Sequence, residues 1–136
     1  MFGLIAIFFS FLMLTSNPTR SYESARNSER MAEISQLMSA IDRWIVTESD
    51  FSGKLTHSGG REVPLCKGTQ PDFTNGIPFP SLDIAKSLVS ENYLAEFPQD
   101  PQFGRTPYYN ICYTSTGTKI TIYAPNVEGE RVSLTR

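Results

Sequence analysis

The sequence predicts an α+β fold in which a long N-terminal α-helix packs on a small antiparallel β-sheet of about three strands. Two observations lead to this prediction. Apolar residues recur every three or four positions through residues 19–48, where neither glycine nor proline occurs, as in an amphipathic helix. The last third of the chain instead holds three short runs rich in β-branched and aromatic residues, which are typical of strands. A loop and a short helix are expected between the two parts.

Length and charge favour one small domain behind an apolar N-terminal segment. The chain has 136 residues and a formal net charge of -2 at pH 7. It contains no run of like charges that would attract a polyanion, so nucleic acid is not expected as a partner. We divide the chain into an apolar segment, residues 1–18, and a globular domain, residues 19–136.

Residues 1–14 contain no charged side chain. As an α-helix they would span about 21 Å, less than the roughly 30 Å hydrocarbon core of a bilayer. A cleaved secretory signal has a Lys or Arg before its apolar part and an A-x-A arrangement of small residues after it. Residues 1–14 have neither. The interpretations are an anchor, a signal, or a helix that leaves a membrane to pack against copies of itself; the third agrees best with the shortness of the segment and with the amphipathic pattern of residues 19–48. The side chains expected in such a filament core are Phe2, Leu4, Ile5, Ile7, Phe8, Phe9, Phe11, Leu12 and Leu14.

Residues 19–48 form the expected amphipathic helix. Its apolar positions step by three and four residues, and pairs of opposite charge stand three positions apart on the other face, which stabilises a helix. The side chains expected to pack on the domain's own sheet are Met31, Ile34, Met38, Ile41 and Ile45. The segment before Met31 has no part of the domain to pack against, so we expect it to need external partners.

The elements after this helix are predicted from turn residues and from strand composition. Residues 49–80 are rich in glycine and proline and are expected to be a loop. A short helix is expected over residues 82–92, with Ser81 as its N-cap. A β-meander is expected over residues 107–135, and its strands are Tyr108–Tyr113, Lys119–Tyr123 and Arg131–Leu134.

The chain has two cysteines, Cys66 and Cys112. The first lies in the expected loop and the second on the first strand of the meander, so a disulfide between them would hold the loop on the sheet. Closing so long a loop stabilises a fold by roughly 4 kcal/mol on the chain-entropy account. Two free thiols in a reducing compartment are the alternative. The disulfide is favoured because the rest of the sequence indicates export from the cytoplasm.

Residues suited to catalysis or metal binding are sparse, and no enzymatic activity is expected. The single histidine, His57, lies in a glycine-rich loop, and Lys67-Gly68-Thr69 lacks the upstream glycine spacing and the preceding strand of a phosphate-binding loop. Two cysteines and one histidine do not complete a zinc site. Asp100 is interpreted as a turn residue, with a calcium ligand as the weaker alternative because no acidic cluster flanks it. No cofactor and no metal are predicted.

Three stretches of the sequence together resemble one family. They are Ala25-Arg26-Asn27-Ser28-Glu29-Arg30-Met31-Ala32-Glu33-Ile34, the run from Leu88 to Pro101 with its Tyr93-Leu94 and Pro98-Gln99-Asp100-Pro101, and Gly104-Arg105-Thr106-Pro107-Tyr108-Tyr109. In this order they are similar to type IV pilins and to the pseudopilins of type II secretion, especially the small protein G type. The family's glycine-terminated leader and its Phe-Thr-Leu-Ile-Glu start are not found here. The resemblance therefore predicts that part of the mature helix precedes Met1, or that this subunit has diverged.

The resemblance implies a pilin-like fold and a structural role. It implies a subunit that waits in the inner membrane and then assembles through its N-terminal helix, with the pilus assembly machinery, into a homo-oligomeric helical filament at the cell surface. A pseudopilin that forms a periplasmic filament for type II secretion is the alternative within the family. A membrane-tethered or secreted binding module, with the long loop as ligand surface, is the alternative of another class.

Overall fold

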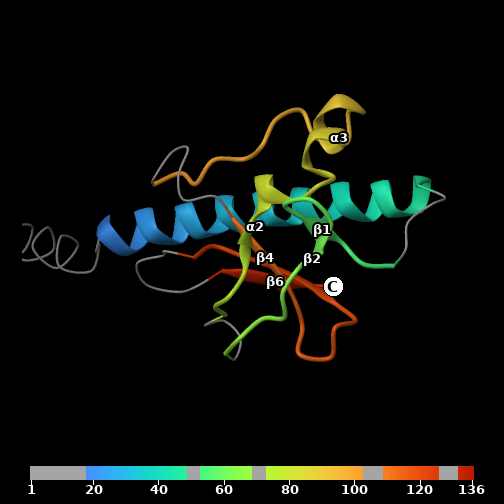
Figure 1. Cartoon of the computed structure of the whole chain (residues 1–136). Helices are drawn as coiled ribbons and strands as arrows, with labels where there is room; N and C mark the ends of the chain where they lie inside the picture. The colour runs from blue at the N-terminus through green and yellow to red at the C-terminus, as the bar shows by residue number, and fades with distance from the viewer. Residues whose placement is uncertain (1–17, 49–52, 69–72, 103–108, 126–131) are drawn as a thin grey trace, which may run out of the picture.

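A computed structural model describes residues 18–48, 53–68, 73–102, 109–125 and 132–136. These residues form an α+β fold with one long helix and a small antiparallel sheet, as the sequence predicts (Figure 1). The apolar segment lies outside the described residues, except for Pro18 at the start of the long helix. No helix among the described residues combines the length and the apolar character needed to cross a membrane.

The long helix, α2, runs without interruption over Pro18–Thr47, within one residue of the expected bounds. Three of its predicted packing residues, Ile34, Met38 and Ile41, are fully buried, and Ile45 is partly buried against the same core. The prediction is wrong for Met31, which is 39% exposed. Three helical turns back from Ile41 lead to residue 30 rather than 31, so Arg30 holds the buried position instead.

The sheet has four antiparallel strands in the order β3-β4-β5-β6. The predicted meander corresponds to β4 (Asn110–Tyr113), β5 (Ile120–Tyr123) and β6 (Ser133–Thr135). An additional edge strand, β3 (Ile77–Pro78), comes from the stretch expected to be a loop. Two residues are too few to show the alternation of a strand, and a proline is tolerated there because an edge strand leaves one side unpaired.

The rest of the expected loop also contains regular structure. A small hairpin pairs β1 (Thr56–His57) with β2 (Arg61–Glu62), and a 3₁₀ turn, η1 (Phe79–Ser81), follows β3. The short helix α3 covers only Ala85–Ser90.

Ser81 is not the N-cap of α3, so that prediction is wrong. It ends η1, and the residue before α3 is Ile84, which makes no side-chain capping bond. Leu82 has an extended backbone and is 3% exposed. The chain turns this side chain into the core before the helix begins, and that turn delays the helix beyond the expected start.

The main core fills the space between α2, the sheet and the η1–α3 region. A smaller cluster surrounds the disulfide between Cys66 and Cys112, whose Cα atoms are 5.1 Å apart. Both cysteines are buried and pack with Tyr123 and Phe73. The disulfide predicted from the sequence is therefore present, and it joins the segment before β3 to the central strand β4.

Candidate functional site: the exposed part of α2 and the groove beside it

Burial along α2 is uneven. Every buried residue of the helix lies at or after Arg30, and none of residues 19–29 is buried. Eleven residues correspond to about 17 Å of helix. In Figure 1 the blue N-terminal end of α2 extends past the strands of the sheet. Tyr22, in this part of the helix, is 67% exposed. Among the described residues, the core therefore covers the N-terminal part of α2 much less than the rest of the helix.

Arg30 anchors α2 at the point where burial begins. Its Nε and Nη2 atoms donate to the two carboxylate oxygens of Asp100, at 2.7 and 3.0 Å. The remaining guanidinium nitrogen donates to Asn27, and Nη2 also reaches Gln102. The hydrogen bond to Asp100 raises the pKa of Arg30, against the lowering effect of burial. A buried charge is tolerated only with such complete pairing.

Asp100 thereby has a role that the sequence did not reveal. Asp100 begins a turn, as expected: its Oδ1 atom accepts a hydrogen bond from the backbone N–H of Gln102 at 2.9 Å. Both carboxylate oxygens face Arg30 rather than a metal ligand set. Within the described ranges no three His, Cys, Asp or Glu side chains are grouped closely enough to hold a metal ion.

A second polar contact joins α2 to the sheet one turn further on. The Tyr109 hydroxyl, next to β4, donates to the carboxylate of Glu33. Partial burial raises the pKa of Glu33, and the hydrogen bond from Tyr109 opposes that shift. Burial and the neighbouring carboxylate also raise the pKa of Tyr109. Together the two contacts set the direction in which the exposed part of α2 leaves the domain.

One face of α2 that points away from the core consists of small residues. They are spaced by four and three positions and are Ser21, Ala25, Ser28, Ala32, Ser35 and Ser39; we call them the small-residue stripe. All are exposed except Ser35, which is half-buried. The Ser28 and Ser35 hydroxyls donate to backbone carbonyls four residues earlier, at 3.0 and 2.8 Å. Because these hydroxyls are satisfied within the helix, the stripe suits close approach of a second helix.

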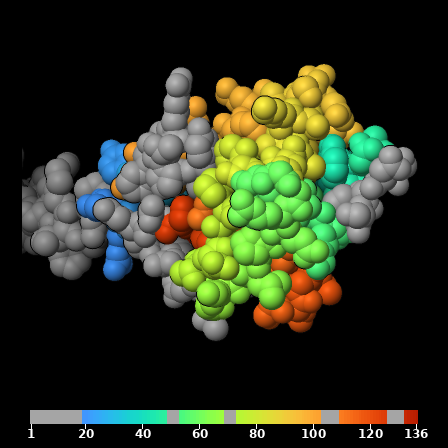
Figure 2. All heavy atoms as spheres, in the orientation of Figure 1, coloured from blue at the N-terminus to red at the C-terminus, as the bar shows by residue number. Residues whose placement is uncertain are grey.

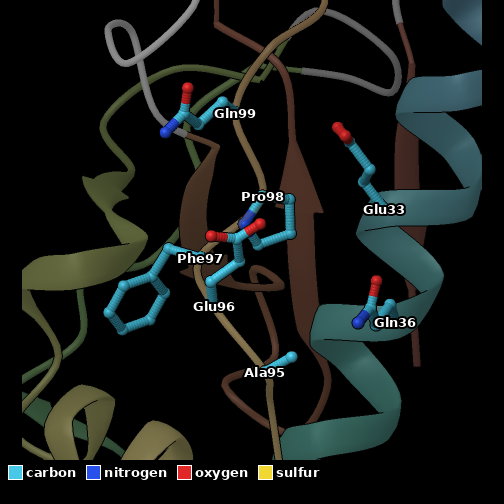
Figure 3. A pocket seen from close by; sticks show the side chains of 7 residues that line it. All are labelled: Glu33, Gln36, Ala95, Glu96, Phe97, Pro98 and Gln99. Carbon is cyan, nitrogen blue, oxygen red and sulfur yellow. The ribbon is translucent and has the colours of Figure 1, made fainter.

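A groove with a volume of about 430 Å³ runs between α2 and the extended segment that follows α3. Glu33 and Gln36 line it from the helix, and Ala95–Gln99 line it from the other side. Figure 3 shows the two helix side chains directed toward the extended segment, whereas Phe97 points away from α2. The ring of Phe97 packs at an angle on Phe79, with 6.0 Å between centroids. The groove therefore has polar sides and a wall fixed by the core.

The structure accounts for some of the candidate residues of the sequence and does not describe others. The disulfide cysteines and most helix–sheet contacts are where they were expected. The filament-core side chains from Phe2 to Leu14 lie outside the described residues. The small-residue stripe was missed, although the same spacing of three and four that revealed the apolar face was its signal. Comparisons with protein-family models, with curated proteins and with solved structures found no match to this chain.

Proposed function

We propose that this protein is the structural subunit of a type IV pilus or pilus-like filament and that it assembles through its N-terminal helix. The observation that carries the proposal is the uneven burial of α2. Eleven residues alone are too few for a stable helix in water, and none of residues 19–29 is buried, although Glu23, Arg26 and Asn27 are half-buried. Neighbouring copies that contribute the same helix supply packing for this part.

The small-residue stripe supports helix-to-helix assembly. Bulky side chains keep helix axes apart, whereas small ones let the backbones approach closely. The stripe runs from Ser21, in the uncovered part of α2, to Ser39, beside the core. A neighbouring helix therefore meets a smooth surface over most of the length of α2.

The uncharged residues 1–14 support a membrane-stored precursor. Transfer of such side chains from lipid to a packed filament core exchanges one apolar environment for another, so the cost per unit area is small. The disulfide supports a location outside the reducing cytoplasm. The proposal therefore places the protein in the inner membrane before assembly and in a surface filament afterwards, with pilus assembly machinery as its partner.

Within the same family of functions, a pseudopilin of type II secretion is the second candidate. It uses the same helix-based assembly and differs in the machinery and in a filament that stays in the periplasm. A membrane-tethered or secreted binding module is the candidate of another class, and the polar groove beside Glu33 favours it. No enzymatic activity is part of any of these proposals.

Electron microscopy of cells that express the full chain with a pilus assembly system tests the proposal. We expect surface filaments from the unchanged chain and none from Ser28→Trp or Ala32→Trp, because a large side chain on the stripe separates the helices. Ser90→Trp, on the exposed end of α3, is the matched control and should keep the filaments. The same experiment with type II secretion machinery in place of the pilus system tests the pseudopilin alternative, which predicts filaments only with the secretion machinery.

Deletion of residues 1–17 should give a soluble monomer that keeps the disulfide. Filaments that persist in this deletion and in both stripe variants would refute assembly through the N-terminal helix. A monomeric full chain that stays in membranes, with no filaments under either machinery, would favour the tethered binding module.

A further inference from the structure

The groove between α2 and Ala95–Gln99 is formed in advance of any binding. Its α2 wall belongs to the main core. Its other wall, Ala95–Gln99, is anchored at the residue that precedes it in the chain. This residue, Leu94, is 1% exposed and donates its N–H to the Leu88 carbonyl at 2.8 Å. At its other end the same wall is anchored by Asp100, the next residue in the chain, through its ion pair with Arg30. The backbone of the groove is therefore ordered by folding, and binding of a partner loses little further conformational entropy there.

The side chains that line the groove have hydrogen-bonding capacity to spare. The side chains of Glu96, Gln36 and Gln99 make no hydrogen bond or ion pair with another described residue. Among the described residues, the Glu33 carboxylate accepts one hydrogen bond, at its Oε2 atom, from the Tyr109 hydroxyl. Two carboxylates and the Gln36 amide therefore line the groove, whereas the Gln99 amide is directed away from α2 (Figure 3). Carboxylates accept from ammonium groups in short, charge-assisted hydrogen bonds, and amide oxygens accept from the remaining N–H groups. The groove suits a surface that carries lysine.

Another surface of the same chain carries two lysines at the far end of β4. Cys66 donates its N–H to the Tyr113 carbonyl at 2.6 Å, and Thr114 donates its N–H to the Lys119 carbonyl at 2.8 Å. Cys66 thus lies against one edge of β4, at Tyr113, and Lys119 lies against the other edge, at Thr114. Lys67, the residue after Cys66, is therefore on the opposite side of β4 from Lys119.

Both lysines are exposed and form no ion pair with a described side chain. Leu65, beside them, is 49% exposed. We call these three residues the lysine patch. Figure 2 shows the green segment before β3 in contact with the orange turn between β4 and β5.

We propose that the lysine patch of one copy docks into the groove of a second copy. The proposal rests on the filament function and adds a contact between globular domains to the helix packing. The charges match, since two lysines meet Glu33 and Glu96, and the apolar Leu65 meets Ala95 and Pro98 in the groove. Because groove and patch are different surfaces, the contact is head-to-tail. Such a contact leaves a free groove at one end and a free patch at the other, so it propagates wherever the rotation between copies does not close a ring.

Cysteine cross-linking of the full chain in cells tests the contact. A Glu96→Cys/Lys119→Cys variant, treated with a bifunctional thiol reagent, should give a ladder of linked subunits. The matched control is Glu91→Cys/Lys119→Cys, because Glu91 is an exposed carboxylate outside the groove. We expect about tenfold more linked subunits for the groove pair than for the control, as for a close charge-matched contact. Peptide mapping verifies that Cys66 and Cys112 remain paired.

A second experiment uses charge reversal. Two differently tagged full-length copies are expressed together, and the amount of one copy that copurifies with the other is measured. Glu96→Lys alone, or Lys119→Glu alone, should lower the recovered pair about tenfold. The two changes together should restore it, because groove and patch then each carry one positive and one negative charge and the opposite charges face each other again. Glu91→Lys and Lys86→Glu, both at exposed positions outside the two surfaces, should leave the recovery unchanged.

The outcomes separate this proposal from the filament function. Filaments without a ladder above the control, or without restoration in the combined variant, would overturn the docking and leave the filament intact. A ladder with restoration but no filaments would support the docking and refute the filament. Binding of a free polyamine to the groove, with no ladder, would show a small-cation site and also overturn the docking.

Discussion

Arg30 and Asp100 form a two-point ion pair whose side chains are only 2% and 4% exposed, although 70 residues separate them in the sequence. The pair joins α2 to the segment that forms one wall of the groove. It lies at the boundary between the covered and uncovered parts of the helix. One contact therefore positions both surfaces to which we assign assembly.

Asp100→Asn should lower the free energy of unfolding by roughly 3–5 kcal/mol, because it leaves the Arg30 guanidinium buried without a counter-charge. Urea unfolding followed by circular dichroism measures the loss. Asp42→Asn is the matched control, since Asp42 pairs with Arg136 at the surface and such pairs contribute about 1 kcal/mol or less. Equal losses in the two variants would contradict a special role for the buried pair.

Replacement of both partners gives a different result from removal of one. Arg30→Met combined with Asp100→Leu should be close to neutral or stabilising relative to the wild type, because no charge is then buried. The same unfolding measurement decides this. If the variant is as unstable as Asp100→Asn, the loss comes from the Asn27 and Gln102 contacts rather than from the unpaired charge.

Glu33 should make stability depend on pH. Burial raises its pKa in the folded state above the ordinary value of 4.5. The folded state then holds the proton more tightly than the unfolded one, so the stabilisation is complete below pH 4.5 and is lost as the pH rises through the folded pKa. Glu33→Gln should remove this dependence. Urea unfolding at a series of pH values from acid to neutral measures the difference between the two proteins.

The Tyr109 hydroxyl provides a check on the same group. It lowers the pKa of Glu33 by its hydrogen bond. Tyr109→Phe should therefore move the loss of stability to higher pH, whereas Glu33→Gln/Tyr109→Phe should show no such shift relative to Glu33→Gln. A pH profile in Tyr109→Phe that coincides with the wild type would argue against the contact.

Loss of the disulfide should destabilise the domain without changing its fold class. Cys66 and Cys112 are 46 residues apart, and opening a loop of that length costs up to about 4 kcal/mol on the chain-entropy account. Thermal or urea unfolding of Cys66→Ala/Cys112→Ala measures the cost. Addition of a reductant should lower the stability of the wild type and leave the double variant unchanged; a reductant effect on both would point to another cause.

Gly76→Ala should destabilise the start of β3. A Cβ atom at this position would lie 2.6 Å from the Tyr123 hydroxyl, which also accepts the Gly76 N–H at 2.9 Å. Tyr123 is 4% exposed and has little room to move, so the overlap should cost about 1–3 kcal/mol. Gly76→Ala in a Tyr123→Phe background should cost less, because the hydroxyl is gone; unfolding of the four proteins completes the cycle.

Local patterns are enough to predict the main elements. The spacing of three and four residues predicts α2 to within one residue at each end, and runs of β-branched and aromatic residues predict β4 and β5. These signals are local because helices and strands repeat over a few residues. The disulfide is predictable for a different reason: the sequence indicates export from the cytoplasm, and with two cysteines only one pairing exists.

The order of amino acids alone is thus sufficient for the fold class, the long helix, the meander and the covalent link. Three-dimensional packing was needed to establish that Arg30 and not Met31 is buried, that Asp100 is its partner, and that Ile77–Pro78 extends the sheet. Burial of a charge or pairing of a two-residue strand depends on groups that lie far away along the chain. No local pattern records such a partner, because the free energy of the contact exists only after the rest of the domain has brought the two groups together.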